Sequence, residues 1–543
     1  MRPVRSHFSN LSTVDSQGFG VARAERERVE RERVEQELLS KRLKPVKTGY
    51  HRNLRCMDGT RRSLLKQIIE WVPNKSGQER NAYWFYGSSG IGKTSLAHSI
   101  CASLHVRSHL AGAFFCRRDD PNLGNPINIL PTFIHKLAIL FSPFRTIVAK
   151  HLRDDPDLTP ESMNGSLFLN FIRSLPRRPE HTLVFVIDAL DECGDAQSRT
   201  RLLEALNNAA VQASWLKIII TSRPELDIQH FFDTLVQSSY LRYDLATDQD
   251  AGADLRTYAR SQFNLVATRC NLGIAWPKES DFNRVISRAN GLFIFIKTLV
   301  LFLWDCRDPQ ESLKAALQDS AGAGLEFLYG LYSSILKAQK SLNNAEFQRM
   351  VGVLLAASPY HALCDKTIAE LAGVKLDLVD TWVKALSSLL YRDEAVNDGI
   401  RVRHLSVYDF FVSNRCDYQI NLRDADVQLG NACLKVMIAQ LHFNICKLGD
   451  SRFANADVGD LPSRVKQNIS DALQYSCLHW LDHLYFPPAN RDQRVLVLGS
   501  LKEFFEGLYP LFWVEVLSVM GMIPIGAPRL RRLLSWVRVS TLV

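Results

Sequence analysis

The eleven cysteines of this 543-residue chain lie far apart and include no C-x-x-C pair. That spacing excludes the usual zinc motifs and a disulfide framework, and it is typical of a reducing compartment, so we expect a cytoplasmic protein. No apolar segment follows the basic start of the chain, so we expect no secretory signal. The one long apolar stretch, residues 508–528, contains Glu515 and is interrupted by Pro510 and Pro524. We expect a buried or partner-facing helix there and no membrane span.

The chain also lacks a strong charge bias and an internal repeat. Its net charge is +9, with 23% charged and 46% hydrophobic residues, which are ordinary globular values. Scattered surface lysines and arginines explain this charge better than a nucleic-acid footprint does. No period of roughly 33 to 45 residues follows residue 414, so a tandem repeat array is not expected. A chain of this length holds about three or four structural units.

A glycine-rich turn stands between an expected strand and an expected helix. Residues 81–86 are apolar and aromatic, as in a buried strand, and the segment after the turn has helical spacing. The turn and the start of the helix are Gly87, Ser88, Ser89, Gly90, Ile91, Gly92, Lys93, Thr94 and Ser95. This is the pattern of a phosphate-binding loop, in which backbone N–H groups and the lysine hold phosphates and the threonine holds Mg²⁺. The alternative is a chance Lys-Thr after a turn; we expect a nucleoside triphosphate to bind here.

A second expected strand ends abruptly in acidic residues. Residues 182–187 are mostly β-branched or apolar, which is typical of a central parallel strand, and Asp188 follows them. Ligands bind at this end of such sheets, so Asp188 is expected to hold Mg²⁺ together with Thr94. Asp191 or Glu192, on the turn that follows, could align or deprotonate an attacking water. The alternative is a strand capped by a solvated acidic turn.

A third expected strand, residues 216–220, leads to Thr221, Ser222, Arg223 and Pro224. At this position the guanidinium of Arg223 could stabilise or sense the charge of a γ-phosphate. An ordinary surface arginine before a proline is the alternative.

Other segments give a coarser picture. We expect disorder in residues 1–20 and a charged helix in residues 21–44, either solvent-exposed or in a weak coiled coil. Further expected elements are a strand at 110–117, a helix at 127–141 interrupted by Pro131, and helices at 166–175, 250–264, 282–303 and 325–338. Residues 367–390 predict two helices around Gly373, and residues 391–403 predict a hairpin.

Helix, turn, helix and hairpin together describe a winged helix. Winged helices often bind DNA, but Asp377 and Asp380 make the second helix acidic in its first half. We therefore expect no nucleic-acid partner. Residues 529–538 are basic and amphipathic, which fits an anionic partner or surface, or a helix packed with its arginines outward.

The three motifs together resemble the NACHT family of STAND-class P-loop NTPases, in its fungal form. Ala189 directly after Asp188, with Asp191 two positions further on, is the detail that carries this resemblance. It implies ATP or ADP and Mg²⁺ as cofactors. It also implies slow hydrolysis and a nucleotide-controlled switch that opens and associates with itself or with related proteins, as in innate-immunity-like signalling.

Two later segments extend the resemblance. Residues 290–295 are similar to a Gly-Leu-Phe-Ile segment of fungal members, although Phe293 stands where many other members have a proline that contacts adenine. Residues 403–411 resemble the end of the winged-helix unit, in which a histidine approaches the β-phosphate. The resemblance thus implies that His404 helps to hold an ADP-bound state, while the residues alone favour a structural histidine that begins a helix.

The expected fold class is an α/β P-loop NTPase domain, with a parallel sheet and helices on both faces, followed by helical units. The expected divisions are a charged N-terminal segment (1–48), the NACHT domain (49–245), a helical domain (246–343), a winged helix (344–420) and an all-α region (421–543). Two other functions stay open. One is an ATPase that remodels nucleic acid or protein complexes, and the other is a truncated relative that titrates larger NACHT proteins.

Overall fold

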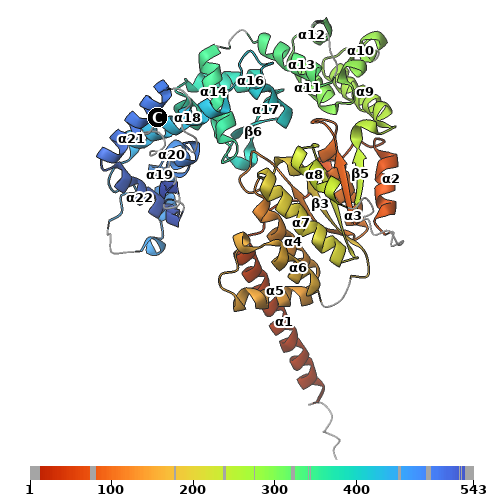
Figure 1. Cartoon of the computed structure of the whole chain (residues 1–543), viewed down its shortest axis with the longest axis vertical. Coiled ribbons are helices and arrows are strands. Elements are labelled where there is room, and N and C mark those ends of the chain that lie inside the picture. Colours follow the sequence, from red (N-terminus) through yellow and green to blue (C-terminus); the bar gives the residue numbers. More distant parts are fainter. Residues whose placement is uncertain are drawn as a thin grey trace, which may run out of the picture. The chain divides into compact units, whose positions relative to one another are not determined.

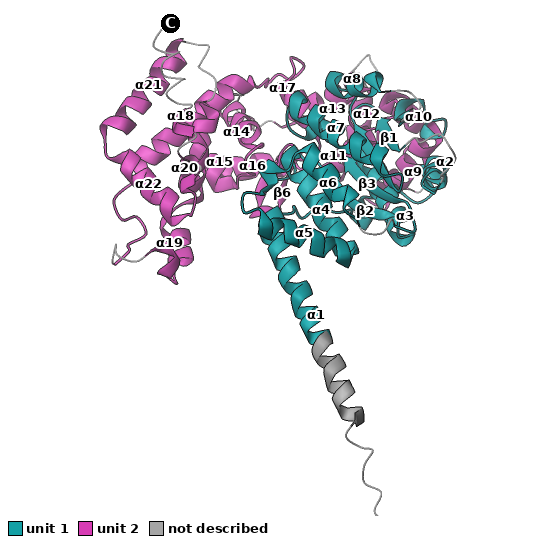
Figure 2. Cartoon of the chain, turned by 60° about the horizontal axis from the view of Figure 1, so that its bottom comes forward, with its two compact units in different colours: residues 1–88, 92–117, 122–251 teal, residues 89–91, 118–121, 252–543 magenta. Residues whose placement is uncertain are grey.

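The computed structural model describes residues 13–73, 81–175, 179–235, 240–273, 276–318, 324–339, 342, 344–449, 454–484, 491–524, 526 and 529–531. The chain forms two compact units (Figure 2). The first comprises Met1–Ser88, Gly92–Arg117 and Asn122–Ala251. The second comprises Ser89–Ile91, Arg118–Pro121 and Gly252–Val543.

A five-stranded parallel sheet organises the first unit (Figure 1). Its strands are β1 (Ala82–Tyr86), β2 (Leu110–Phe115), β3 (Leu183–Asp188), β4 (Leu216–Ser222) and β5 (Tyr240–Asp244), in the order β2-β3-β4-β1-β5. Both β3 and β4 are buried at every position, as their Val/Ile-rich sequences predict. The four expected strands are confirmed. The edge strand β5 was not expected, because its alternation of aromatic and charged residues is short and half-exposed.

Helices cover both faces of this sheet. They are α1 (Thr13–Leu43), α2 (Arg62–Trp71), α3 (Lys93–Val106), α4 (Ile129–Leu140), α5 (Ser142–Asp154), α6 (Gly165–Arg173), α7 (Ala196–Gln212) and α8 (Leu226–Thr234). Side chains alternate between the faces of a strand. Trp84, Ile187 and Ile218 therefore share one core with α4 to α8, while Val186 and Ile219 are buried on the side of α3. The predicted fold class, an α/β P-loop fold followed by a large helical region, is confirmed.

The expectation that Pro131 interrupts a helix is wrong. Helix α4 begins at Ile129, so Pro131 lies in its first turn, where the backbone N–H that proline lacks has no helical partner to lose. Helix α5, with Pro143 in its own first turn, was not expected. Both differences come from the exact position at which a helix begins.

Helix α1 is only partly a solvent-exposed charged helix. It begins at Thr13, so the expectation of disorder up to residue 20 is wrong for residues 13–20, and residues 1–12 lie outside the described residues. Its exposed part carries ion pairs such as Arg28–Glu25 (2.6 Å). Near its C-terminal end, Leu39 and Leu43 are buried in the first unit's core, and α1 packs against α4 and α5. This end of the helix is therefore part of the folded unit.

A buried histidine joins the segment before α2 to helix α3. His98 Nδ1 accepts a hydrogen bond from the His51 backbone N–H (3.1 Å), and the ring of His98 stacks on Phe115. Burial lowers the pKa of His98 to about 4, with the neighbouring His51 adding to the effect. The uncharged ring thus fits this packing, and the protonated ring does not.

We expect His98 to make the fold sensitive to acid. Its folded-state pKa lies below the usual value of about 6.5, so its contribution is present above pH 6.5 and is lost as the pH falls towards 4. The whole loss is roughly 3 kcal/mol in the free energy of unfolding. Urea unfolding of the chain and of His98→Gln between pH 7 and 4 should show a smaller pH dependence for the variant. Parallel curves would contradict the assignment.

The second unit is mostly helical. Its helices are α9 (Ala251–Arg269), α10 (Glu279–Ala289), α11 (Phe293–Asp305), α12 (Pro309–Gln318), α13 (Leu325–Lys337), α14 (Asn344–Ala357), α15 (Asp365–Ala372), α16 (Leu376–Ala385), α17 (Leu405–Val412), α18 (Leu422–Gln440), α19 (Leu461–Asn468), α20 (Asp471–His483), α21 (Arg491–Glu506) and α22 (Tyr509–Val519). The single helix expected over residues 282–303 is wrong. Asn290 and Gly291 both have a positive φ (43° and 84°), which ends α10 before α11 begins.

The expected order of two helices and a hairpin is present in this unit. Gly373 ends α15 with φ +62°, and α16 follows. Strands β6 (Leu390–Asp393) and β7 (Gly399–Val402) then form an antiparallel pair, with Asn397 and Asp398 at positive φ in the turn. The assignment of a winged helix, and the domain divisions proposed from the sequence, stay predictions.

The apolar stretch near residue 510 forms α22, which buries Trp513, Val516 and Leu517 and exposes Leu511. None of the described helices combines the length and the apolar character needed to cross a bilayer. In the basic segment 529–538, Arg529 forms an ion pair with Asp482 (2.7 Å). Residues 532–538 of that segment lie outside the described residues.

Candidate functional site

The glycine-rich turn lies between β1 and α3, as expected. Gly92 has φ +100° at the N-cap of α3, a conformation that favours glycine, and Lys93 is the first helical residue. The Lys93 ammonium donates to the carbonyl oxygens of Gly87 (2.7 Å) and Ser88 (2.9 Å). Its side chain is buried, which lowers the pKa of Lys93 to about 8, against the opposing effect of nearby carboxylates. A buried ammonium held by two carbonyl oxygens can exchange them for phosphate oxygens, which are stronger acceptors.

The tip of the turn, Ser89 to Ile91, belongs to the second unit by its contacts. Within that unit, the Gly90 carbonyl accepts a hydrogen bond from the backbone N–H of Ile294 (3.2 Å). A Cβ added at Gly90 would lie 2.0 Å from Ile294 Cγ2, and φ at Gly90 is +85°. Only glycine fits there. Ser95 lies in the first turn of α3 and is half-buried.

Asp188 ends β3 and is almost completely buried (2% exposed). Its carboxylate accepts hydrogen bonds from the hydroxyl of Thr221 (2.5 Å) and from the side chain of Thr94. Burial raises the pKa of Asp188 to about 6, although these hydroxyls and the Lys93 charge act in the opposite direction. The two residues predicted to hold Mg²⁺, Thr94 and Asp188, are therefore in direct contact.

Thr221 is a functional residue that the sequence did not reveal. It lies in β4, next to β3, and its hydroxyl both donates to Asp188 and accepts the backbone N–H of Ala189 (3.1 Å). Ala189 has φ +54°, so this bond helps to hold the chain where it turns after the strand. The sequence does show a hydroxyl residue directly after three isoleucines. It does not show that Asp188 is the partner of this hydroxyl, because that depends on β3 and β4 being neighbours.

Asp191 and Arg223 form a pair. Asp191 is buried, and its carboxylate accepts the Arg223 backbone N–H (3.0 Å) and lies 3.4 Å from Arg223 Nε. The Arg223 side chain keeps 21% of its surface exposed. Asp191 thus orients the arginine, and Glu192, the next residue, is half-buried.

These residues converge on one place in the first unit. The charges that act on the Lys93 ammonium are those of Asp188, Asp191, Glu192 and Arg223. They come from β1, β3 and β4, whose carboxyl ends meet at the same edge of the parallel sheet (Figure 1). The arrangement of a buried lysine, a Thr-Asp pair and an arginine beside the glycine turn suits a magnesium-bound phosphate chain.

His404 lies in the second unit as the N-cap of α17. Its Nδ1 accepts the backbone N–H of Ser406 (3.1 Å), and Ser406 Oγ is also bonded to the hydroxyl of Tyr332 (2.8 Å). A Cβ added at Gly90, in the same unit, would lie 3.8 Å from His404 Cε1. The histidine thus has a structural capping role, and its ring lies beside the tip of the glycine turn.

Comparison with known proteins supports this description of the first unit. Residues 59–223 match the family model described as Nephrocystin 3, N-terminal. The first unit has a P-loop fold. The matched residues include the P-loop turn, Asp188 and Arg223. No curated protein matches the chain.

Several solved structures are similar to the chain at low identity. The Walker-type ATPase PABY2304 of Pyrococcus abyssi is 13% identical, with a TM-score of 0.31, and the match covers 64% of this chain and 95% of that one. The Aeropyrum pernix Orc1 protein, solved in complex with DNA, is 12% identical (TM-score 0.29; 67% and 94% covered). The replication initiator DnaA, bound to AMPPCP and single-stranded DNA, is 11% identical (TM-score 0.25; 87% and 100% covered). Such low scores carry no argument about what this P-loop protein binds.

Proposed function

We propose that the chain is a nucleotide-dependent switch that binds ATP or ADP with Mg²⁺ and hydrolyses ATP slowly. The observation that carries the proposal is the convergence of Lys93, Thr94, Asp188 and Arg223 at one edge of the sheet. Nothing in ordinary packing requires a lysine and four other charged groups to gather around a glycine turn.

Each residue has a role that follows from its contacts. The backbone N–H groups of residues 87–95 and the Lys93 ammonium would hold the phosphates, and the Thr94 hydroxyl and the Asp188 carboxylate would hold the cation. Thr221 keeps the Asp188 carboxylate in place. When bound, Mg²⁺ would neutralise part of the negative charge on the phosphate oxygens.

The pairing of Asp191 with Arg223 supports a role for the arginine at the γ-phosphate. Asp191 holds the arginine, so Arg223 is oriented to respond to the charge of a γ-phosphate. Asp191 or Glu192 would align the attacking water. The slow rate that we propose is implied by the NACHT resemblance, in which hydrolysis resets a switch.

Switching requires that the two nucleotides favour different arrangements of the chain. The NACHT resemblance points to Arg223 and His404 as the groups that respond to the γ- and β-phosphates. It also points to opening and self-association as the output, through a helical domain (246–343) and a winged helix (344–420).

The test is to purify the chain and identify the nucleotide that remains bound to it. Tightly held ADP that leaves only on exchange with ATP supports the switch. A site that releases nucleotide within seconds and turns over ATP rapidly favours a motor, and absence of any ATP or ADP binding refutes both.

We expect His404→Ala to accelerate ADP release by about tenfold, the value of one hydrogen bond to a charged group. Nδ1 accepts the Ser406 N–H, so a hydrogen bond to a phosphate would be made through Nε2. Stopped-flow release of a fluorescent ADP analogue measures the rate. His442→Ala, at an exposed histidine of the same unit, is the control. An unchanged rate in His404→Ala would remove this residue from the mechanism.

An ATPase that acts on nucleic acid is the second candidate, because the second unit contains two helices followed by a hairpin. Against it, Asp380 on α16 pairs with Lys384 (2.7 Å) and Arg392 (2.9 Å), so the basic residues here are neutralised. Stimulation of ATP turnover by DNA or RNA would favour this candidate over the switch.

A further inference from the structure

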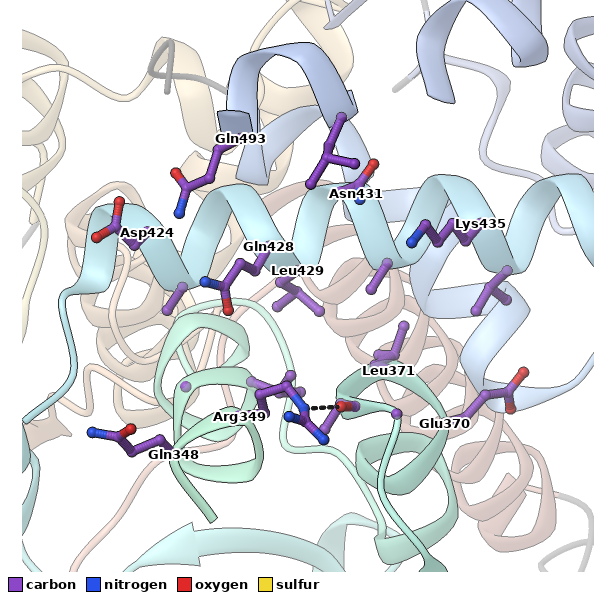
Figure 3. A pocket seen from close by; sticks show the side chains of 18 of the residues that line it. Gln348, Arg349, Glu370, Leu371, Asp424, Gln428, Leu429, Asn431, Lys435 and Gln493 are labelled. Carbon is purple, nitrogen blue, oxygen red and sulfur yellow. Dashed lines mark hydrogen bonds between the residues drawn. The ribbon is translucent and has the colours of Figure 1, made fainter. Parts of the chain in front are cut away.

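A groove of about 890 Å³ lies within the second unit (Figure 3). Helices α14, α15, α18 and α21 line it, together with the segment that leads into α18. Neither the phosphate loop nor any residue of the proposed switch takes part in it. The groove therefore requires an explanation of its own.

The groove is elongated, because it follows one face of α18. Residues spaced three or four apart along this helix, from Asp424 to Gln440, line it. At 1.5 Å per residue this stretch is roughly 24 Å long. An extended peptide rises about 3.3 Å per residue, so about seven residues would fill the groove. A compact metabolite would occupy only a part of it.

Carboxamide side chains dominate the polar lining. Gln348 on α14, Gln428 on α18 and Gln493 on α21 are labelled around the cavity in Figure 3. None of these three makes a hydrogen bond within the described ranges of the chain, and the Oε1 atom of Gln493 is buried without a partner. Each carboxamide can both donate and accept a hydrogen bond. A peptide backbone presents the matching N–H and C=O groups at regular intervals.

Two cations, Arg349 on α14 and Lys435 on α18, stand among these carboxamides. Arg349 Nε donates to the carbonyl oxygen of Ala372 at the end of α15 (3.1 Å; dashed line in Figure 3), and this bond fixes the guanidinium at the cavity. Its two terminal nitrogens are not bonded to any of the described residues. They form a planar fork of the kind that binds a carboxylate with two hydrogen bonds. Acidic residues at the rim, Asp424 and Glu370, make a polyanion a poor ligand.

We propose that this groove binds an extended segment of a partner protein, about seven residues long, with an acidic side chain at Arg349. The backbone of the segment bonds to Gln348, Gln428 and Gln493, and its carboxylate bonds to the Arg349 fork. Backbone bonds give affinity without dependence on sequence, and the acidic side chain held by Arg349 gives specificity.

The first test uses a phage-displayed library of random twelve-residue peptides against the immobilised full chain. Enriched peptides should share an acidic residue at one position. Their affinities, measured by fluorescence anisotropy, should fall on the order of tenfold or more in Arg349→Ala and about fivefold in Gln428→Ala. Arg415→Ala, at an exposed arginine of the same unit, is the control and should bind normally. No enrichment, or enriched peptides that bind all variants equally, would overturn the proposal.

Arg349 also donates to the Ala372 carbonyl, so Arg349→Ala could weaken binding by disturbing the fold. Two further variants distinguish this effect from the loss of a peptide contact. Gln428 is exposed and makes no bond in the described structure, so Gln428→Ala tests the groove without that risk. Arg349→Glu should lose the acidic peptide and gain the same peptide with lysine in place of the acid. The groove would be excluded as the peptide site if Arg349→Glu did not bind the lysine peptide and Gln428→Ala bound the acidic peptide normally.

Discussion

Lys93→Ala should bind neither ATP nor ADP measurably, with affinity reduced by a factor on the order of a hundred or more. The ammonium is buried at the glycine turn, where only two carbonyl oxygens hold it, so its position is set before any ligand arrives. Such preorganisation gives a charge its greatest effect on binding, because no energy is spent in placing it. Isothermal titration with MgATP and with MgADP measures the loss.

The fold should survive this substitution. Burial lowers the pKa of Lys93 to about 8, so its charge is unfavourable to the folded state, and alanine removes that cost. Thermal unfolding of Lys93→Ala without nucleotide should therefore occur no lower than that of the natural chain. Lys66→Ala, at an exposed lysine of α2, is the control for binding. Undiminished ATP affinity in folded Lys93→Ala would refute the assignment of the phosphate loop.

Asp188→Asn should abolish the magnesium dependence of nucleotide binding and lower the rate of hydrolysis by about a hundredfold or more. An asparagine oxygen can still accept the Thr221 hydroxyl, so the strand end should keep its shape. What is lost is the negative charge that a divalent cation requires. Affinity for ATP measured with and without Mg²⁺ should differ in the natural chain and become equal in the variant.

The matched control for this prediction is Asp233→Asn, which removes an exposed carboxylate of the same unit that pairs with Arg242. It should leave both affinity and hydrolysis unchanged. If Asp188→Asn kept its response to Mg²⁺, the cation would be held elsewhere and the proposed roles of Thr94 and Asp188 would both be wrong.

The sequence predicts most of the strands, turns and helices that carry the residues of this site. Strand, glycine turn and helix around Lys93, the buried strand before Asp188 and the strand before Arg223 can all be recognised, because each is a local pattern of apolar residues and turn residues. The hairpin before His404 is predicted for the same reason, from Asn397 and Asp398 in its turn.

Contacts between distant segments could not be predicted in this way. That β4 lies between β1 and β3 is a property of the sheet, and it is this order that brings Thr221 to Asp188 and Arg223 to Asp191. Likewise, the break at Asn290 depends on two positive φ angles in an otherwise apolar stretch that reads as one helix. The groove beside Arg349 is formed by four helices, and no local pattern indicates it.

The C-terminal end of α1 has a consequence for how the protein can be truncated. Leu39 and Leu43 are inserted among the side chains of the first unit, and Arg42 donates to the carbonyl oxygens of Leu152, Asp155, Pro156 and Leu158. A fragment beginning at residue 49 would lack α1 and would expose the apolar surface of α4 and α5 that α1 covers. Copies of the fragment could aggregate through this surface. Fragments expressed from a start ahead of Glu35 should therefore be soluble, whereas shorter fragments should precipitate.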